Sequence, residues 1–244
     1  MEWQSEGAVL SMRPHGESSA IIEVFTALHG LHAGVVRGGA SRKMAAYLQA
    51  GAQVMVTWRA RLGTHMGAFT VEPIAARAGV LSDPLALAGL NAVCALLRVG
   101  LAERQPVGAF WGQTMALLND MEAGRDWPPN YLRWERDLLD VLGFGLDLGV
   151  CAVTGSREDL AYVSPKSGRA VSAAGAGQWA DRLLPLPPAL LGQGPASSLE
   201  IGQGLLVTGH FLARGLEPVL NGRPLPQARA RLLARLARAA SQIS

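Results

Sequence analysis

Hydrophobic and polar residues alternate through the first 75 residues, in short runs that end at turn residues. The clearest run covers residues 53–62, where Val54, Val56 and Trp58 share one face and Thr57 and Arg59 share the other. Such alternation is typical of half-buried β-strands. We therefore expect five strands, at residues 8–13, 18–28, 32–37, 53–62 and 66–74, with a loop at residues 38–51.

Beyond residue 82 the apolar positions recur at the spacing of helices. Ser82-Asp83-Pro84 is a typical helix start, because it combines an N-cap acid with proline in the first turn. Helices are predicted at about residues 84–103, 107–121, 129–143, 197–213 and 227–240. Residues 146–177 contain Gly and Ser without a helical period, and they predict a small insert that is irregular or made of β-turns.

These patterns predict an α+β protein with two domains. Residues 1–78 fit an OB-fold, a five-stranded β-barrel of about this size that often binds oligonucleotides. An SH3-like barrel fits the strand pattern almost as well. Residues 79–244 are expected to form a mainly helical domain that contains the insert.

Charge is unevenly distributed along the chain, whose formal net charge is +3. Residues 24–71 and 218–244 contain no acid, so residues 1–71 carry a net +2 and residues 218–244 a net +5. The segment between them carries a net −4. A segregated basic surface suits a polyanion such as nucleic acid, although ordinary surface arginine would explain the charge alone about equally well.

Composition indicates a cytoplasmic protein. The first six residues carry two acids where a secretory signal would carry Lys or Arg. The longest uncharged stretch, residues 183–199, holds four prolines and cannot continue as a membrane-spanning helix. The only cysteines, Cys94 and Cys151, do not form a disulfide framework and fit a reducing compartment.

Sequence motifs for catalysis are absent. The chain has no Gly-x4-Gly-Lys-Ser/Thr phosphate loop, no Gly-x-Ser-x-Gly elbow and no His-Glu-x-x-His zinc motif. Neighbouring acids, such as Asp137 with Asp140 and Glu158 with Asp159, are better explained as surface charge than as a metal-dependent nuclease site. We therefore expect a protein that is not an enzyme and that has no cofactor.

Five segments, in the same order along the chain, resemble the RecO family. They are residues 7–20, residues 29–43, Leu48-Gln-Ala-Gly51, residues 131–145 with their Leu-Gly-Phe-Gly turn, and Leu220-Asn-Gly-Arg-Pro-Leu-Pro226. The resemblance implies an OB-fold followed by a helical domain, and a protein that binds single- and double-stranded DNA in the nucleoid. It also implies annealing of complementary strands without ATP, and a partnership with RecR. Together the two would help to load RecA onto DNA coated with single-stranded-DNA-binding protein, whose acidic C-terminal tail the family recognises.

One departure from the family concerns metal. Many members carry a zinc site of two Cys-x-x-Cys pairs, the first just after the Leu-Gly-aromatic-Gly turn. Here the first pair would begin at Cys151, but its partner position is Thr154, and the second pair falls on residues 170–175 without cysteine. Because a tetrahedral zinc ion needs about four Cys or His ligands, we expect no zinc.

Arginine suits phosphate binding because its planar donor fork stays charged. Basic residues in and near the predicted barrel strands are therefore the main DNA-binding candidates, with the first β-turn and the last helix as weaker ones. Tyr47 is the preferred base-stacking candidate, since Phe25 and Phe69 are more readily explained as core and Trp58 almost certainly is. The full set of DNA-binding candidates is Arg37, Arg42, Lys43, Arg59, Arg61, Tyr47, Arg13, His15, Arg231, Arg235 and Arg238.

For the acidic tail we expect a groove between helices with Arg133 and Arg136 at its rim. If the resemblance is set aside, the residues leave two alternative functions open. An RNA-binding OB-fold protein linked to translation would share the same charge pattern, and a metal-dependent nuclease is disfavoured by the lack of a carboxylate cluster.

Overall fold

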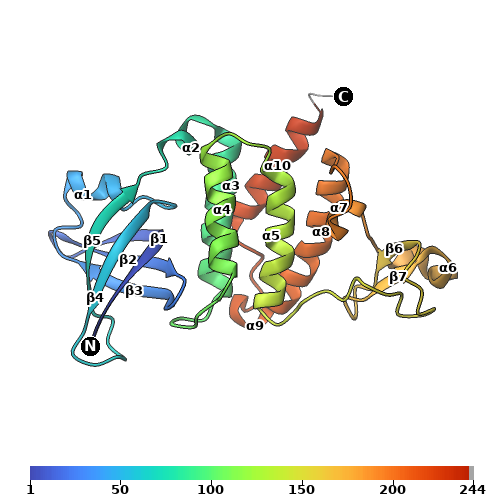
Figure 1. Cartoon of the computed structure of the whole chain (residues 1–244), viewed down its shortest axis with the longest axis horizontal. Helices are drawn as coiled ribbons and strands as arrows, with labels where there is room; N and C mark the ends of the chain where they lie inside the picture. The colour runs from blue at the N-terminus through green and yellow to red at the C-terminus, as the bar shows by residue number, and fades with distance from the viewer. Residues whose placement is uncertain (242–244) are drawn as a thin grey trace. The chain divides into compact units, whose positions relative to one another are not determined.

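The computed structural model describes residues 1–241 and shows an α+β protein, as the sequence predicts (Figure 1). The chain forms two compact units, Met1–Arg125 and Asp126–Ser244. The first contains all five strands predicted at the N-terminus, together with helices that follow them. The second is mainly helical and contains the insert.

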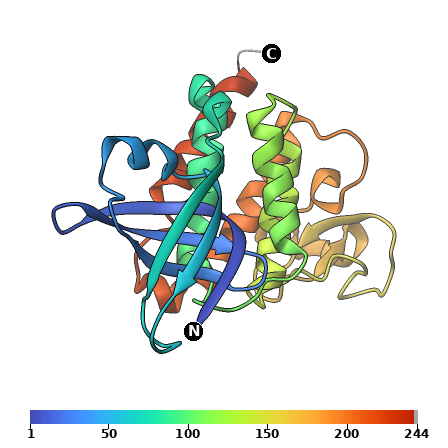
Figure 2. The same cartoon turned by 60° about the vertical axis from the view of Figure 1, so that its left-hand side comes forward.

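The first unit begins with a closed five-stranded barrel of order β1-β2-β3-β5-β4. Its strands are β1 (Glu2–His15), β2 (Ser19–Thr26), β3 (Gly30–Val36), β4 (Gln53–Arg59) and β5 (Ala68–Ala75). Neighbouring strands are antiparallel except β3 and β5, whose short parallel pairing over Val35–Ala68 and Val36–Phe69 closes the barrel (Figure 2). The predicted OB-fold is confirmed by this arrangement.

Several details of the barrel differ from the sequence prediction. Strand β1 begins at Glu2 rather than near residue 8, because Glu2–Ala8 pairs in register with β4. The predicted loop at residues 38–51 contains a short helix, α1 (Arg42–Tyr47), whose N-terminus is capped by the Ser41 hydroxyl accepting from Met44 N.

The barrel interior holds the apolar face that the alternation predicted. Val54 and Val56 are fully buried, and Trp58 is 2% exposed while its indole Nε1 donates to Met66 O at 2.8 Å. The core assignment of Trp58 is therefore correct. Strand β4 ends at Arg59, however, so Arg61 and the exposed Leu62 lie in the β4–β5 loop rather than on a continued strand.

Helices α2 (Ala78–Ser82), α3 (Pro84–Gly100) and α4 (Phe110–Glu122) belong to the same compact unit as the barrel. Asp83 caps α3, as predicted, by accepting from Leu85 N at 2.8 Å. The buried Arg77 donates from Nε to Gly51 O at 2.8 Å and from Nη1 to Asn119 Oδ1 at 2.9 Å. This side chain connects the barrel directly to α4.

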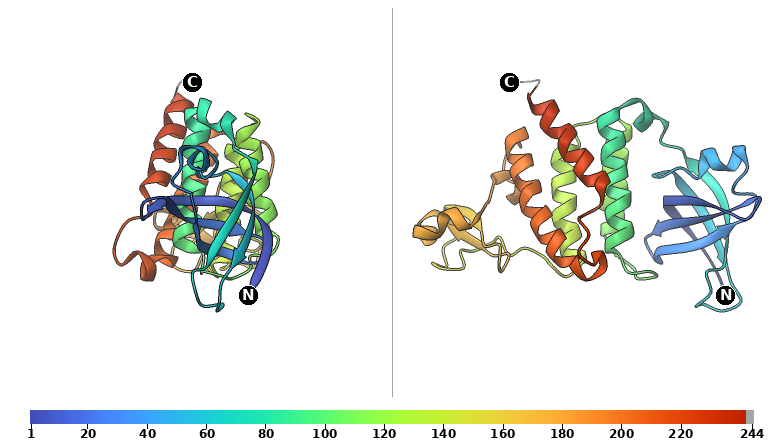
Figure 3. Two further views of the ribbon diagram at one scale, coloured as in Figure 1. Left: turned by 90° about the vertical axis from the view of Figure 1, so that its left-hand side faces the viewer. Right: turned by 180° about the vertical axis from the view of Figure 1, so that it is seen from behind.

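The second unit is built on α5 (Pro128–Val141), α8 (Ser198–Gly215) and α10 (Gln227–Ser241). Helix α8 packs against both α5 and α10, with the short helices α7 (Pro188–Leu191) and α9 (Glu217–Leu220) beside it (Figure 3). Leu138, Leu205, Leu212 and Leu232 are fully buried in this unit. Among the described residues, no helix is long and apolar enough to span a membrane.

The insert has more regular structure than the sequence indicated, and it extends beyond residue 177 to Pro185. A three-stranded sheet of order β7-β6-β8 contains β6 (Leu160–Val163), β7 (Ala170–Ser172) and β8 (Leu184–Pro185). Between β7 and β8 lie α6 (Ala173–Ala176) and the 3-10 helix η1 (Gly177–Arg182). Cys151, Val171 and Ala176 form its small buried core. Such short strands carry too few alternating positions to be recognised from sequence.

Candidate nucleic-acid interface

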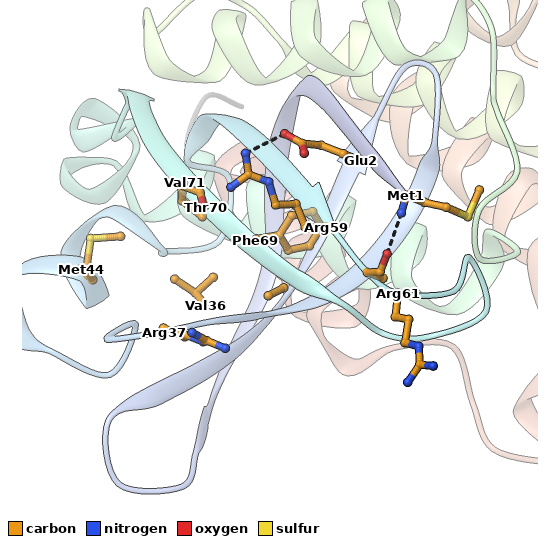
Figure 4. A pocket seen from close by; sticks show the side chains of 12 residues that line it. Met1, Glu2, Val36, Arg37, Met44, Arg59, Arg61, Phe69, Thr70 and Val71 are labelled. Atoms are coloured by element: carbon orange, nitrogen blue, oxygen red, sulfur yellow. Dashed lines mark hydrogen bonds and ion pairs between the residues drawn. The ribbon is translucent and has the colours of Figure 1, made fainter.

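Three of the predicted DNA-binding arginines line one groove on the barrel. Arg37 follows β3, Arg59 ends β4 and Arg61 lies in the β4–β5 loop, and all three line a cavity of about 800 Å³ (Figure 4). Apolar side chains line it as well, from β3, α1 and β5: Val36, Met44, Ala68, Phe69 and Val71. This barrel groove therefore combines accessible cations with an apolar wall, a combination suited to a single nucleic-acid strand.

An acid that the sequence analysis did not consider also lines the barrel groove. Arg59 Nη2 donates to Glu2 Oε1 at 2.7 Å, and both side chains are more than half exposed. This hydrogen bond lowers the pKa of Glu2 and raises that of Arg59, so both groups are charged at neutral pH. An exposed pair of this kind is weak, so a phosphate can compete with the carboxylate for Arg59.

The remaining barrel candidates lie outside this groove. Arg42 and Lys43 are exposed in α1, of which only Met44 lines the groove. Arg13 and His15 are exposed near the end of β1, which continues through the residues expected to form a loop. The structure therefore brings together Arg37, Arg59 and Arg61, and leaves the other basic residues as separate surface positions.

The aromatic candidates occupy different environments. Phe25 is fully buried, with its ring centroid 5.3 Å from that of Trp111, so it belongs to the core. Phe69 is only 4% exposed yet lines the barrel groove. Tyr47, the preferred stacking candidate, is half-buried at the end of α1 and does not line that groove.

Helix α10 presents the predicted basic stripe. Arg231, Arg235 and Arg238 are exposed on one side of the helix, whereas Leu232 is fully buried on another. The nearby Arg229, which contributes to the same acid-free stretch, is 6% exposed and pairs with Glu135 of α5. The basic surface of this stretch is therefore smaller than its sequence suggests.

A second groove, of about 860 Å³, runs between α8 and α10 in the helical unit. Its walls are mostly apolar and include the strongly exposed Leu199 and Leu206 together with Leu233 and Leu236. The expected rim residues do not lie along it. Arg133 is exposed on α5, and Arg136 is half-buried and donates to Asp137 Oδ1 and to Leu190 O.

The surroundings of Cys151 do not fit a zinc ion. Its Sγ accepts hydrogen bonds from the backbone N of Val153, Thr154 and Ser172 and from Ser172 Oγ, at 3.2–3.4 Å. The recorded hydrogen-bond partners of this sulfur include no second thiol and no imidazole, whereas zinc needs about four such ligands. Within the part of the chain that the structure describes, no group of three or more His, Cys, Asp or Glu side chains could hold a metal ion.

The closed barrel places the first unit in the OB-fold class, many of whose members bind nucleic acid. Two family models match the chain: Recombination protein O N terminal over residues 1–77, and Recombination protein O C terminal over residues 81–224. The chain therefore belongs to the RecO family of DNA repair proteins. Its role is in DNA repair and recombination, and it binds DNA.

Similar full-length relatives carry the name DNA repair protein RecO. One from Cereibacter sphaeroides is 68% identical over 239 residues, covering 98% of this chain and all of the relative. One from Ruegeria sp. is 58% identical over 98% of this chain and 99% of the relative. One from Roseobacter denitrificans is 58% identical over 96% of this chain and 97% of the relative. The resemblance recognised from sequence motifs is thus confirmed.

Proposed function

We propose that this protein is a recombination mediator that anneals complementary single strands and, with RecR, helps to load RecA onto DNA coated with single-stranded-DNA-binding protein. The observation that carries the proposal is the barrel groove, which is lined by Arg37 after β3, by Arg59 and Arg61 at and after the end of β4, and by Phe69. Binding is the proposed mode of action, without catalysis or a cofactor. The proposed place of action is the cytoplasmic nucleoid, where the chromosome lies.

The groove supports backbone binding with little sequence preference. Arginines bind phosphates regardless of base, and the apolar wall can contact a base or a sugar without reading hydrogen-bonding edges. Arg13, His15, Arg42, Lys43 and Tyr47 are proposed as further contacts outside the groove. Annealing needs two bound strands, and the basic region on α10, at Arg231, Arg235 and Arg238, is proposed to hold the second strand.

For the acidic tail of single-stranded-DNA-binding protein, we propose the helical unit. The groove between α8 and α10 offers apolar walls, and α10 contains no acid. Arg133 is exposed on α5 and stays a candidate for electrostatic contact, whereas Arg136 is partly engaged by Asp137 and Leu190. Replacing Leu206 by Asp is expected to weaken binding of a tail peptide. An equal effect of Arg133→Ala with none of Leu206→Asp would instead place the tail on α5.

The decisive experiment is an annealing assay on complementary oligonucleotides precoated with single-stranded-DNA-binding protein, without ATP or Mg²⁺ and with or without RecR. Wild-type protein should accelerate annealing, and RecR should assist RecA loading in a parallel assay. The double variant Arg59→Ala/Arg61→Ala should bind single-stranded DNA more weakly, with its salt slope reduced by about 1.4 because each lost phosphate contact removes about 0.7.

Arg157→Ala is the matched control, because Arg157 is an exposed arginine in the insert. It should leave the affinity and the salt slope unchanged. Unchanged binding by Arg59→Ala/Arg61→Ala would show that the barrel groove is not the DNA site. Absence of annealing combined with tighter binding to structured RNA than to single-stranded DNA would favour an RNA-binding function instead.

A further inference from the structure

The β4–β5 loop, which carries Arg61 to the barrel groove, is fastened by a residue from outside the barrel. Arg104 lies in the connection between α3 and α4, and its guanidinium donates to two carbonyls of this loop. Nη1 binds Gly63 O, and Nη2 binds His65 O at 2.9 Å. The planar fork of arginine matches two acceptors presented side by side, so it can hold both at once.

Arg104 itself has a defined position. Its backbone N donates to Leu31 O at 2.8 Å, and the adjacent Glu103 forms a parallel bridge with Leu31. Gly30 has a φ of +57°, and a Cβ there would overlap the carbonyl oxygen of Gln105. The connection therefore lies directly against β3, and the side chain of Arg104 extends from this fixed point to the loop.

The other hydrogen bonds recorded between this loop and the rest of the barrel lie at its two ends, and within the loop His65 N donates to Leu62 O. Ala60 N donates to Met1 O, Trp58 Nε1 donates to Met66 O, and Val35 N donates to Gly67 O. Arg104 alone reaches Gly63 and His65 from a distant part of the chain, among the hydrogen bonds recorded for residues 1–241. Its charge also acts on the barrel: burial first and Arg104 second lower the pKa of His32 to about 4.

We propose that Arg104 is a positioning residue for DNA binding, which acts by holding the β4–β5 loop so that Arg61 stays at the barrel groove. The inference rests on the proposed function of that groove. Two of the five N–H donors of its guanidinium bind carbonyl oxygens of the loop, so the proposed role of Arg104 is to hold the loop and not to contact a phosphate. Loss of the Arg104 guanidinium should therefore weaken DNA binding without removing a phosphate contact.

The test uses the full chain, a fluorescent single-stranded oligonucleotide and salt titrations. Arg104→Lys keeps the charge but lacks the fork, and Arg104→Gln lacks both. Each is expected to lower affinity about three- to tenfold, as one or two hydrogen bonds would, with an unchanged salt slope. Arg61→Ala should reduce the slope by about 0.7. Arg104→Lys added to Arg61→Ala should weaken binding little further, because both changes act through the same side chain.

A structural readout accompanies these measurements. Trypsin cleavage after Arg61 should accelerate in Arg104→Lys, and amide NMR shifts should change mainly within residues 60–67. Arg125→Lys, at an exposed arginine paired with Asp120 in the same unit, is the matched control and should change neither binding nor cleavage. Both readouts require folded protein. If Arg104→Gln does not fold, Arg104→Lys alone carries the test.

The possible outcomes distinguish a failure of the positioning role of Arg104 from a failure of the proposed function of the barrel groove. If Arg104→Lys binds as wild type while Arg61→Ala weakens binding, the positioning role is overturned and the proposed function stands. If Arg104→Gln lowers the salt slope as Arg61→Ala does, Arg104 is a direct contact and the positioning role is overturned. If neither Arg61→Ala nor Arg104→Lys affects binding, the barrel groove is not the DNA site and this inference falls with it.

Discussion

Arg229 of α10 binds Glu135 of α5 through two hydrogen bonds, from Nε to Oε1 at 2.8 Å and from Nη2 to Oε2 at 2.9 Å. Both side chains are buried. Tyr131 Oη and Thr208 Oγ1 each donate to the same carboxylate at 2.6 Å, and Arg229 Nη2 also donates to Leu205 O. Each carboxylate oxygen thus accepts two hydrogen bonds, and the network connects α5, α8 and α10.

Breaking this network should destabilise the helical unit. Removal of one partner leaves a buried charge without compensation, so Arg229→Met is expected to cost about 3–5 kcal/mol. Urea denaturation followed by circular dichroism measures this as a lower midpoint. Glu217→Gln, which changes an exposed acid in the same unit, is the control. A midpoint equal to that of wild type for Arg229→Met would show that the pair contributes no stability.

Removal of the Glu2 carboxylate should strengthen DNA binding. Glu2→Gln releases Arg59 from its ion pair and removes a negative charge from the barrel groove. Because an exposed pair is weak, affinity should rise only by up to about fivefold at low salt. Fluorescence anisotropy with a labelled single strand measures the effect. Glu158→Gln makes the same charge change in the insert, and an equal gain there would attribute the effect to net charge alone.

Cys151 should ionise at an unusually low pH. Burial raises its pKa, but the donors from Ser172 and Thr154 outweigh burial and lower the pKa from 9.0 to about 6. Burial raises the pKa of Cys94 to about 12. Thiolate absorbance near 240 nm should therefore show one cysteine step near pH 6 that disappears in Cys151→Ser. A step near pH 9 instead would mean that the hydrogen bonds do not favour the thiolate.

The same shift makes the stability contribution of Cys151 depend on pH. The pKa of this thiol is lower in the folded than in the unfolded protein. Its ionisation therefore adds fully to the free energy of unfolding above the unfolded-state pKa near 9, and this addition is lost as the pH falls toward 6. The difference in unfolding free energy between wild type and Cys151→Ser should therefore grow from pH 6 to pH 9. A constant difference across this range would contradict the assignment.

The α10 stripe should contribute phosphate contacts separate from the barrel groove. Replacing Arg231, Arg235 and Arg238 together by alanine is expected to reduce the salt slope for a single strand by up to about 2. A matched triple change in the insert, at Arg157, Arg169 and Arg182, should leave the slope unchanged. If the α10 variant binds as wild type, the stripe is a solvated helix face that does not contact DNA.

Short-range patterns predicted much of the fold correctly. The alternation around Val54 and Val56 identified a barrel strand, and Asp83 identified the start of α3, because both signals depend on residues a few positions apart. The first half of β1 and helix α1 were missed. Glu2 to Ala8 becomes a strand through pairing with β4, and α1 depends on a weak Ser41 cap over only six residues.

The candidate site was predictable in its residue types but not in its assembly. Arg37, Arg59 and Arg61 were recognisable as basic residues in an acid-free stretch, yet only barrel closure through β3 and β5 places them around one groove. Glu2 and Arg104 carried no local signal, since the first acts through a residue 57 positions away and the second through carbonyls about 40 positions away.

The sequence by itself determined the class of fold, the family and the basic character of the two terminal regions. Periodicity, helix caps and motifs depend on residues that are close in sequence, so they can be recognised without the tertiary structure. Only the tertiary structure decided which charges are available. It buries Arg229 against Glu135, pairs Arg59 with Glu2 and commits Arg104 to the β4–β5 loop, because burial and hydrogen bonding depend on neighbours that folding brings from distant parts of the chain.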